Sequence, residues 1–503
     1  MSAVLLRVYL VFALCVVVGT MTLGIRESRV LGDAVTQASQ HSPGPRDRSA
    51  TNTAAQWPAH VSWIAAGGGP TPEFNQLSLE SDLALASGVF GAEEGVVLFA
   101  GGPGSRAVQV LDSEERGDDL RMALAEFFDA RQGRDAHYEA VSIPTLGAAT
   151  REATLDAIRR ALEGGPANSP LTVFLVGHGD RGDVPGDASL SMWGDGVIHP
   201  ADLATLFDKY QREHPVRYVV TSCYSGGFSE ALYTGAKINR RVTNFDRCGF
   251  FASTWTEQAS GCDPNPDRGA HQGYAVNFLH ALRGEDRSGH AIARTEIDFN
   301  RDGAVSFLEA HTYASLSSAS IDIPTTTSQS YLRDVAPPAD GGGDVAPAMP
   351  ENDAIIATLA ARLGLAGRDE EARNELATRE LMINALRRDS EAAADEENAA
   401  YERAAAVLLG RYPVLDDPWH PDFEATLRNN EDDIIAFFES AREIAAWQQA
   451  QEVSADVAER LELLTVDIAP YRRFSRALED RELAARLHRL GGLTWTRYER
   501  FLA

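Results

Sequence analysis

The sequence predicts an α/β fold, in which a parallel-dominated sheet carries helices on both faces, followed by a separate all-α domain. Three observations support this prediction. Short, nearly continuous apolar runs alternate with amphipathic helical periods from residue 58 to residue 333, as in sheets that are buried on both faces. A Pro/Gly-rich linker occupies 334–353. Residues 354–503 then keep a helical apolar spacing with few glycines.

The predicted elements follow one another in strand–helix order up to the linker. Active sites of parallel sheets collect at the carboxyl ends of the strands, so chemistry is expected directly after each apolar run. The strands are predicted at 60–66, 95–100, 171–176, 216–221 and 249–254. The helices between them are predicted at 76–89, 118–132, 150–163, 200–212 and 273–282.

Residues 1–24 are typical of an export signal. Arg7 precedes the apolar run 8–18, which is short for a membrane-spanning helix and of the right length for a signal-peptide core. No A-x-A cleavage site follows, so an uncleaved membrane anchor is the alternative. Residues 25–57 lack an apolar period and predict a flexible linker. We therefore expect an exported chain that is periplasmic, extracellular or anchored on the outer side of a membrane.

The chain is acidic and uses arginine almost to the exclusion of lysine. Its 503 residues include 46 Lys plus Arg and 73 Asp plus Glu, which gives a formal net charge of −27. Nucleic acid and anionic membrane surfaces need a basic footprint, so the charge argues against both as partners. Lys209 and Lys237 are the only lysines, which indicates a GC-rich genome and a bacterial origin.

Three cysteines remain when Cys15, inside the signal segment, is set aside. An odd number in an exported chain leaves one thiol over. Cys248 and Cys262 are close in sequence and flank one strand-plus-loop unit, so we predict a disulfide between them in an oxidising compartment. This pairing leaves Cys223 free, which is the condition that a nucleophile needs.

Two of the predicted strands end in residues that can carry chemistry. The strand at 171–176 runs into Gly177-His178-Gly179, and the strand at 216–221 runs into Ser222-Cys223. One helix separates the two strands, so they are expected to be neighbours, with their following loops about 5 Å apart at the roots. His178 and Cys223 can therefore face each other across a cleft.

This pair suits acyl transfer through a thiol. A free thiol has a pKa near 8.5, and a neighbouring imidazole can take its proton and later protonate the leaving amine. The backbone N–H of Gly179 can approach a developing oxyanion, and Gly226 and Gly227 permit a sharp turn after the nucleophile. The alternative is a small buried cysteine and an ordinary loop histidine. Their joint placement at consecutive strand ends favours catalysis.

The segments VFLVGHGDRG and YVVTSCYSGGFSE resemble the histidine and nucleophile strands of the caspase-like clan of cysteine peptidases, and within it the legumain group. FFASTWTEQASGCD resembles the strand and loop that follow. The likeness covers about residues 58–325 and does not reach the C-terminal helices. It implies a caspase-like fold and a cysteine-type endopeptidase that works through a thioester acyl-enzyme. In that family pattern His178 matches the base, Cys223 the nucleophile and Gly179 the oxyanion glycine.

One departure concerns substrate recognition. The legumain group has an acidic residue shortly before the nucleophile, where this chain has Thr221 and Ser222. Its preference for Asn or Asp is therefore not carried over. The resemblance implies that the first specificity pocket is built from the loop after the first strand, at 67–80, and from the segment after the nucleophile, at 253–260.

The candidate residues for substrate contact are polar residues of these two segments, and one arginine. Glu73, Glu80 or Glu257 would select a basic P1 side chain. Arg106 would select an acidic one. Each of these four residues also fits an ordinary surface position. The predicted substrate-binding set is Ser253, Thr254 and Glu257.

Residues 298–309 match the twelve-residue EF-hand loop at every diagnostic position, with Gly303 at the sixth. Average composition gives such a match by chance on the order of once per thousand chains of this length. The alternative is an acidic turn that caps a helix beginning near residue 306. We predict a structural Ca²⁺ site. Its expected ligands are Asp298, Asn300, Asp302, the carbonyl of Ala304, Ser306 and Glu309.

Several functions stay open at this level. A transpeptidase or transamidase would use the same dyad, if an amine outcompetes water at the acyl-enzyme. An inactive caspase-like scaffold would leave the helical domain at 354–503 to bind a protein partner, and a thiol enzyme of another class is a weaker reading. In an active enzyme the helical domain could also act as a self-inhibitory cover.

Overall fold

The computed structural model describes residues 57–58, 60–91, 94–111, 118–129, 136–166, 168–239, 241–339 and 345–502. The predicted export signal and nearly all of the N-terminal linker lie outside this part. Within the described ranges, no helix is both long and apolar enough to cross a membrane. The chain divides into two compact units. One holds 116–130 and 378–467, and the other holds 55–115, 131–377 and 468–503.

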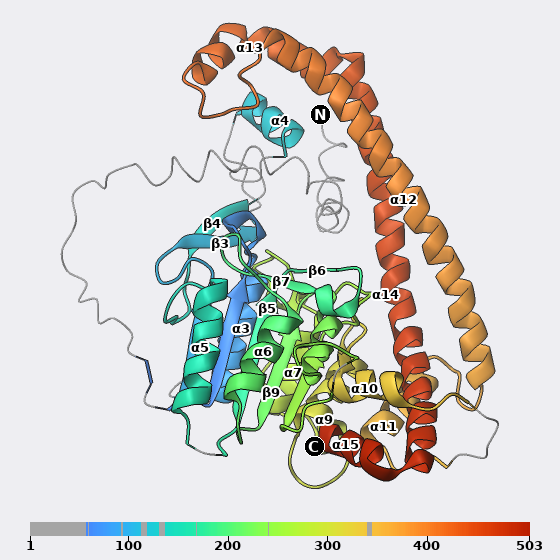
Figure 1. The fold of residues 1–503 in the computed structure, drawn as a ribbon. Helices are drawn as coiled ribbons and strands as arrows, with labels where there is room; N and C mark the ends of the chain where they lie inside the picture. Colours follow the sequence, from blue (N-terminus) through green and yellow to red (C-terminus); the bar gives the residue numbers. More distant parts are fainter. Residues whose placement is uncertain are drawn as a thin grey trace. The chain divides into compact units, whose positions relative to one another are not determined.

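A six-stranded sheet forms the centre of the second unit (Figure 1). The strand order is β11-β10-β9-β5-β1-β2, and all neighbours are parallel except β10 and β11. The inner strands are buried almost throughout, which explains their continuous apolar sequence. The predicted parallel-dominated sheet is confirmed. The strands are β1 (Trp63–Gly68), β2 (Gly95–Phe99), β5 (Leu171–Gly177), β9 (Val216–Thr221), β10 (Arg247–Phe251) and β11 (Thr325–Thr326).

Helices cover both faces of this sheet, as predicted. Alternate residues of β1 enter different cores: Trp63 and Ala65 join one hydrophobic cluster, and Ile64 and Ala66 join another. The first cluster includes residues of α3 (Leu77–Phe90), α7 (Tyr274–Arg283), α9 (Phe307–Ser317) and α10 (Thr327–Val335). The second includes residues of α5 (Arg151–Gly164) and α6 (Pro200–Tyr210).

Several short elements were not predicted from the sequence. One antiparallel pair joins β3 (Arg106–Leu111) to β4 (Ala136–Ala140), and a small sheet joins β6 (Gly179–Asp180), β7 (Ser189–Ser191) and β8 (Val197–Ile198). The short helices are η3 (Pro72–Phe74), η5 (Pro185–Asp187), η6 (Ser225–Leu232), η7 (Arg268–Ala270) and α8 (Arg294–Ile297). Of these, β6 begins directly after His178, and η6 begins two residues after Cys223.

The C-terminal region is all helical, as predicted, but it does not stay apart from the sheet along its whole length. Residues 468–503 belong to the same compact unit as the sheet. The Phe501 ring packs on Tyr331 at 5.3 Å between ring centroids. Arg473 donates to the backbone carbonyls of Asp322 at 2.7 Å and Ser318 at 2.8 Å. The helices are α11 (Pro350–Arg362), α12 (Asp369–Arg411), α13 (Phe423–Ser440), α14 (Arg442–Leu490) and α15 (Gly492–Leu502).

The other unit contains an element that the sequence places with the sheet. Helix α4 (Asp119–Phe127), predicted as part of the strand–helix alternation, shares a core with α12, α13 and α14. The Phe127 ring lies 5.1 Å from Tyr401, 5.6 Å from Phe438 and 5.1 Å from Trp447, centroid to centroid. Its amphipathic pattern predicts a helix, whereas its apolar face packs on residues that lie about 270 to 320 positions away in the sequence.

Candidate active site

The strands that carry His178 and Cys223 are direct neighbours. Strands β5 and β9 pair in parallel, with Val176 opposite Thr221. His178 and Cys223 each follow this last pair by two residues, so the expected adjacency of the two strand ends is confirmed. A Cβ on Gly179 would fall well inside van der Waals distance of the Cys223 carbonyl oxygen. The two loops are therefore in close contact, and only a glycine fits at 179.

The His178 ring is held by one of its two nitrogens. Its Nε2 lies 2.8 Å from the carbonyl oxygen of Phe74 and 3.0 Å from Oε1 of Gln76. Both partners are acceptors, so Nε2 carries the proton and Nδ1 has the lone pair. Burial lowers the pKa of His178, although the hydrogen bond to Phe74 and the charge of Asp180 act to raise it. The imidazole is thus neutral at neutral pH and can accept a proton at Nδ1.

The Cys223 thiol lies in a mostly buried position beside the loop after β10. The backbone N–H of Ala259 donates to Sγ at 3.3 Å, and Sγ lies 3.5 Å from the Ala259 carbonyl oxygen. Burial raises the pKa of Cys223 to about 12, against the hydrogen bond from Ala259. The thiol is therefore protonated at rest and needs a base for attack.

The chain turns sharply directly after Cys223, but through a different residue from the one expected. Tyr224 has φ = +57° in the left-handed region, and its N–H donates to the Glu257 carbonyl at 2.9 Å. Gly226 and Gly227 have no positive φ. They are needed for packing, because a Cβ on Gly226 would lie 2.8 Å from the Ser253 carbonyl oxygen. A left-handed backbone at a bulky non-glycine residue such as Tyr224 is uncommon and marks this turn as a strained position.

The predicted substrate-binding set, Ser253, Thr254 and Glu257, lies beside the loop that holds Cys223 but makes internal contacts. Ser253 is fully buried, and its Oγ donates to the Ser222 carbonyl at 3.3 Å. Thr254 is also buried. Glu257 forms an ion pair with Arg472 of α14 at 3.2 Å. These residues support the nucleophile loop, and none of the three lines the pocket described below.

The other residues considered for substrate selection are also placed elsewhere. The Glu80 carboxylate accepts from the backbone N–H of Ser142 at 2.6 Å. Arg106 donates to the Tyr138 carbonyl at 3.1 Å, and Glu73 is exposed on η3. Their side-chain types suit a specificity role, but none of them lines that pocket.

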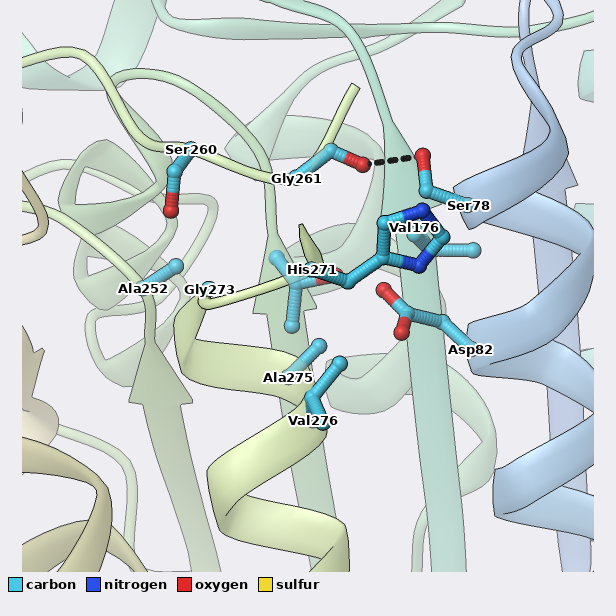
Figure 2. Close-up of a pocket in the computed structure, with 11 residues that line it drawn as sticks. Ser78, Asp82, Val176, Ala252, Ser260, Gly261, His271, Gly273, Ala275 and Val276 are labelled. Atoms are coloured by element: carbon cyan, nitrogen blue, oxygen red, sulfur yellow. Dashed lines mark hydrogen bonds between the residues drawn. The ribbon is translucent and has the colours of Figure 1, made fainter. Parts of the chain in front are cut away.

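A small pocket opens between the dyad strands and α3 (Figure 2). Its lining includes Val176 and Thr221, which precede His178 and Cys223 by two residues each. Asp82 of α3 also lines it, and Figure 2 shows the Asp82 carboxylate beside His271. The sequence analysis missed Asp82. The available signal was a carboxylate on the apolar face of a predicted helix, three residues after Leu79 and four before Ala86.

The predicted disulfide between Cys248 and Cys262 is not formed, and none of Cys223, Cys248 and Cys262 takes part in a disulfide. Cys248 is at the start of β10, with its Sγ 3.7 Å from the Phe501 carbonyl oxygen. Cys262 follows Gly261, which lines the pocket at the far end of the strand. The strand between them spans roughly 13 Å, beyond the reach of about 7 Å that a disulfide bridges.

The EF-hand-like segment adopts a tight loop between α8 and α9. The backbone N–H of Gly303 donates to Oδ2 of Asp298 at 3.1 Å, and that of Ala304 donates to Oδ1 of Asp302 at 2.8 Å. Oδ1 of Asp298 is buried and has no hydrogen-bond partner. A buried, unpaired carboxylate oxygen suits a cation, because its desolvation is otherwise not offset.

Other features of this loop fit the helix-capping alternative. Ser306 is the N-cap of α9, where Glu309 N–H donates to Ser306 Oγ at 3.1 Å and Ser306 N–H donates to Glu309 Oε2 at 2.8 Å. The N–H of Asn300 also donates to Oε1 of Glu309. Throughout the described part of the chain, no three His, Cys, Asp or Glu side chains are gathered closely enough to hold a metal ion.

Comparisons with known proteins give distant matches only. No protein-family model and no curated protein matches the chain. Among solved structures, caspase-1 from Spodoptera frugiperda aligns over 48% of this chain and 78% of its own, at 12% identity and a TM-score of 0.24. A secreted C11 cysteine protease from Bacteroides thetaiotaomicron, in complex with an irreversible peptide inhibitor, aligns over 44% of this chain and 54% of its own, at 16% identity and a TM-score of 0.21.

Proposed function

We propose that the protein is a cysteine-type endopeptidase of the caspase-like clan, with Cys223 as nucleophile and His178 as general base. The observation that carries this proposal is the shared register of the two residues, each two positions beyond the Val176–Thr221 pair. A thiol and an imidazole at one end of neighbouring parallel strands form the minimum machinery for acyl transfer. The legumain-like sequence around both residues supports the same assignment.

The reaction follows from the hydrogen bonds around the pair. Phe74 and Gln76 hold the His178 proton on Nε2, so Nδ1 removes the proton from the Cys223 thiol as Sγ attacks the peptide carbonyl carbon. The Gly179 N–H stabilises the resulting oxyanion. The C–N bond then breaks, His178 gives its proton to the leaving amine, and a thioester remains on Cys223. Water, deprotonated by His178, hydrolyses the thioester and regenerates the thiol.

The resting state of this dyad is a neutral pair. Burial raises the pKa of the thiol and lowers the pKa of the imidazole, and both shifts disfavour a thiolate–imidazolium ion pair in the free enzyme. Proton transfer is therefore coupled to attack on the substrate. A protein with this arrangement reacts slowly with small thiol reagents and rapidly with reagents that bind as peptides.

The C-terminal segment of α14 is part of this catalytic unit. Arg472 pairs with the Glu257 carboxylate, and the Glu257 carbonyl accepts the Tyr224 N–H directly after the nucleophile. Arg473 binds the carbonyl of Asp322, whose carboxylate accepts the Ser260 N–H at 2.6 Å. Both arginines thus hold the loop that contacts Cys223. We propose that this segment supports the active site and that its removal inactivates the enzyme.

Cleavage of a peptide library by the full chain tests the proposed function. We expect endopeptidase activity that is abolished in Cys223→Ala and reduced at least about 1,000-fold in His178→Ala, since each removes one half of the dyad. Cys248→Ala is the matched control, because Cys248 is a free thiol remote from the dyad on the same sheet. Equal activity of the wild type and Cys223→Ala would overturn the proposal.

We also propose that residues 298–309 bind Ca²⁺ as a structural ion. The support is the EF-hand pattern, the Asp298 and Asp302 carboxylates that accept N–H groups of the loop, and the buried Asp298 Oδ1 that lacks a partner. To bind the ion, the Glu309 carboxylate would give up its hydrogen bonds from the backbone N–H groups of Asn300 and Ser306. A bound ion would supply positive charge among these carboxylates and fix the start of α9.

A further inference from the structure

We propose that Asp322 is a positioning residue for the nucleophile, because its carboxylate fixes the one peptide group whose carbonyl oxygen faces the Cys223 thiol. This inference rests on the proposed peptidase function, and it adds a residue that acts on Cys223 through the loop after β10. Asp322 lies shortly before β11, far along the chain from both members of the dyad.

The Cys223 thiol makes both of its hydrogen bonds, within the described part of the chain, with Ala259. Its S–H donates to the Ala259 carbonyl oxygen at 3.5 Å, and its sulfur accepts the Ala259 N–H at 3.3 Å. The carbonyl stabilises the protonated thiol, whereas the N–H stabilises negative charge on the sulfur when His178 removes the proton. The backbone at Ala259 therefore governs both the resting thiol and its activation.

The Ala259 carbonyl and the Ser260 N–H belong to the same peptide group. A trans peptide is planar, so its C=O and N–H point in opposite directions and cannot turn independently. Oδ1 of Asp322 accepts the Ser260 N–H at 2.6 Å. Holding this N–H therefore also fixes the direction of the carbonyl at the other end of the peptide group, which faces the Cys223 thiol.

The Asp322 carboxylate is itself held from several directions. The residue is fully buried, and its two oxygens also accept the Ser260 hydroxyl at 3.0 and 2.9 Å and the Tyr274 N–H, at the start of α7, at 2.7 Å. Its own carbonyl accepts from Arg473 of α14 at 2.7 Å. Burial raises the pKa of Asp322, whereas the hydrogen bond from Ser260 and the charge of Arg473 act to lower it. These contacts give the carboxylate a fixed position from which to hold the loop.

Other contacts attach the loop on both sides of this peptide group. The Glu257 carbonyl accepts the Tyr224 N–H at 2.9 Å, and the Gly261 carbonyl accepts the Ser78 hydroxyl at 2.5 Å. Loss of the Asp322 carboxylate would therefore leave the loop attached beside the nucleophile and let the peptide group between these contacts turn. The expected result is a misplaced thiol in a folded protein.

Steady-state kinetics of the full chain test this proposal. Asp322→Ala should lower kcat on the order of 100-fold, with KM within about threefold of the wild type, because the nucleophile is misplaced while the contacts to substrate remain. Ser260→Ala keeps the N–H that Asp322 binds, so its loss of kcat should stay below about tenfold. Asp322→Asn keeps the size of the side chain but can accept only one of the two backbone N–H groups, so its kcat should lie between these two.

Alkylation of Cys223 tests the same contact without peptidase activity. Treatment of the full chain with iodoacetamide, followed by mass spectrometry, gives the rate at Cys223 relative to the buried Cys248, which lies at the other end of β10. In Asp322→Ala the released thiol should react at least about tenfold faster relative to Cys248, although peptide cleavage becomes slower. General unfolding would instead accelerate the reaction at both cysteines.

Ile158→Ala is the control for general destabilisation, since Ile158 of α5 is fully buried in the other core. It should lower the Tm and leave the ratio of the two alkylation rates unchanged. An unchanged ratio in Asp322→Ala, or a loss of kcat in Ser260→Ala as large as that in Asp322→Ala, would overturn the proposal. A wild-type chain that cleaves no peptide, together with the expected change in the ratio, would contradict the peptidase assignment and still support the hold of Asp322 on Cys223.

Discussion

His178 and Cys223 occupy equivalent positions on two neighbouring parallel strands, each two residues beyond the paired Val176 and Thr221. Their backbones are in such close contact that Gly179 has no room for a Cβ beside the Cys223 carbonyl. The adjacency of these two residues therefore follows from the register of β5 and β9. Several measurable consequences follow.

Replacement of Gly179 by alanine should separate the two loops. The added Cβ would clash with the Cys223 carbonyl oxygen and lie 2.8 Å from Ser222 Oγ, so we expect kcat/KM to fall by about 100-fold or more, since small displacements of reacting groups are costly. Gly88→Ala is the control, because a Cβ there meets nothing within 4 Å inside α3. It should raise stability by about 0.5–1 kcal/mol. Full activity of Gly179→Ala would contradict the close contact.

A carboxylate at position 76 should shift the pH profile of the base. Oε1 of Gln76 lies 3.0 Å from His178 Nε2, so Gln76→Glu places a negative charge beside the imidazole and raises its pKa. The acid limb of kcat/KM should then move to higher pH. Gln76→Ala, which adds no charge, should show no comparable upward shift. An acid limb at the same pH in Gln76→Glu and in the wild type would mean that His178 is not the group that titrates.

The stability of the chain should fall with rising pH because of Asp82. Its pKa is about 8 in the folded protein and 3.8 in the unfolded chain, so between these values the folded state holds a proton that the unfolded state has released. The free energy of unfolding therefore decreases from about pH 4 to pH 8. His271, Arg287, Asp322 and Cys262 are the other ionisable groups near this carboxylate.

Asp82→Asn removes this titration, so the variant should match the wild type at pH 4 and exceed its Tm by several degrees at pH 8. Thermal unfolding monitored by circular dichroism across this range is the measurement. A constant difference in Tm at all pH values would show that Asp82 does not titrate in the folded state as described.

The ion pair between Arg472 and Glu257 should couple α14 to the nucleophile loop. Both side chains are largely buried, at 9% and 25% exposed, and removal of one partner takes away part of the compensation of the other charge. Arg472→Gln and Glu257→Gln should each reduce activity about tenfold, and a double-mutant cycle on unfolding should give a coupling on the order of 1 kcal/mol or more. Strictly additive effects would exclude the pair as a support of the active site.

Calcium should stabilise the chain against heat. We expect the Tm to rise by several degrees in millimolar Ca²⁺ relative to excess chelator, because a ligand that binds only the folded state raises its stability. Asp298→Asn should weaken this effect, since it neutralises the carboxylate whose Oδ1 lacks a partner. Magnesium is the control cation. A Tm that does not respond to calcium would leave the loop as a helix cap formed by Ser306 and Glu309.

The sequence predicted the sheet and the adjacency of the His178 and Cys223 strand ends because their signals are local. A strand that is buried on both faces, such as β5, has a continuous apolar sequence. The end of that apolar run shows where the strand stops and the loop with His178 begins. The class of the longer strands and helices followed from the same periodicities, whereas the short elements did not.

Other features depend on contacts between distant residues. The Cys248–Cys262 pairing was wrong because sequence proximity does not show that β10 carries the two thiols to opposite ends. The partner of Phe127 lies in the C-terminal helices, and the role of Glu257 depends on Arg472, which is more than 200 residues away. The sequence shows Asp82 as an acidic residue on the apolar face of the predicted helix α3. Only the fold shows that it lines a pocket beside the strand ends that lead to His178 and Cys223.

The central claim is that Cys223 is the nucleophile of a peptidase, and covalent labelling tests it most directly. The full chain would be treated with a set of peptidyl acyloxymethyl ketones that differ in the P1 residue, digested and analysed by mass spectrometry. The dyad predicts one adduct, on Cys223, which disappears in His178→Ala although all three thiols remain. Labelling that spreads equally over Cys248 and Cys262, or that is unaffected by the loss of His178, would contradict it.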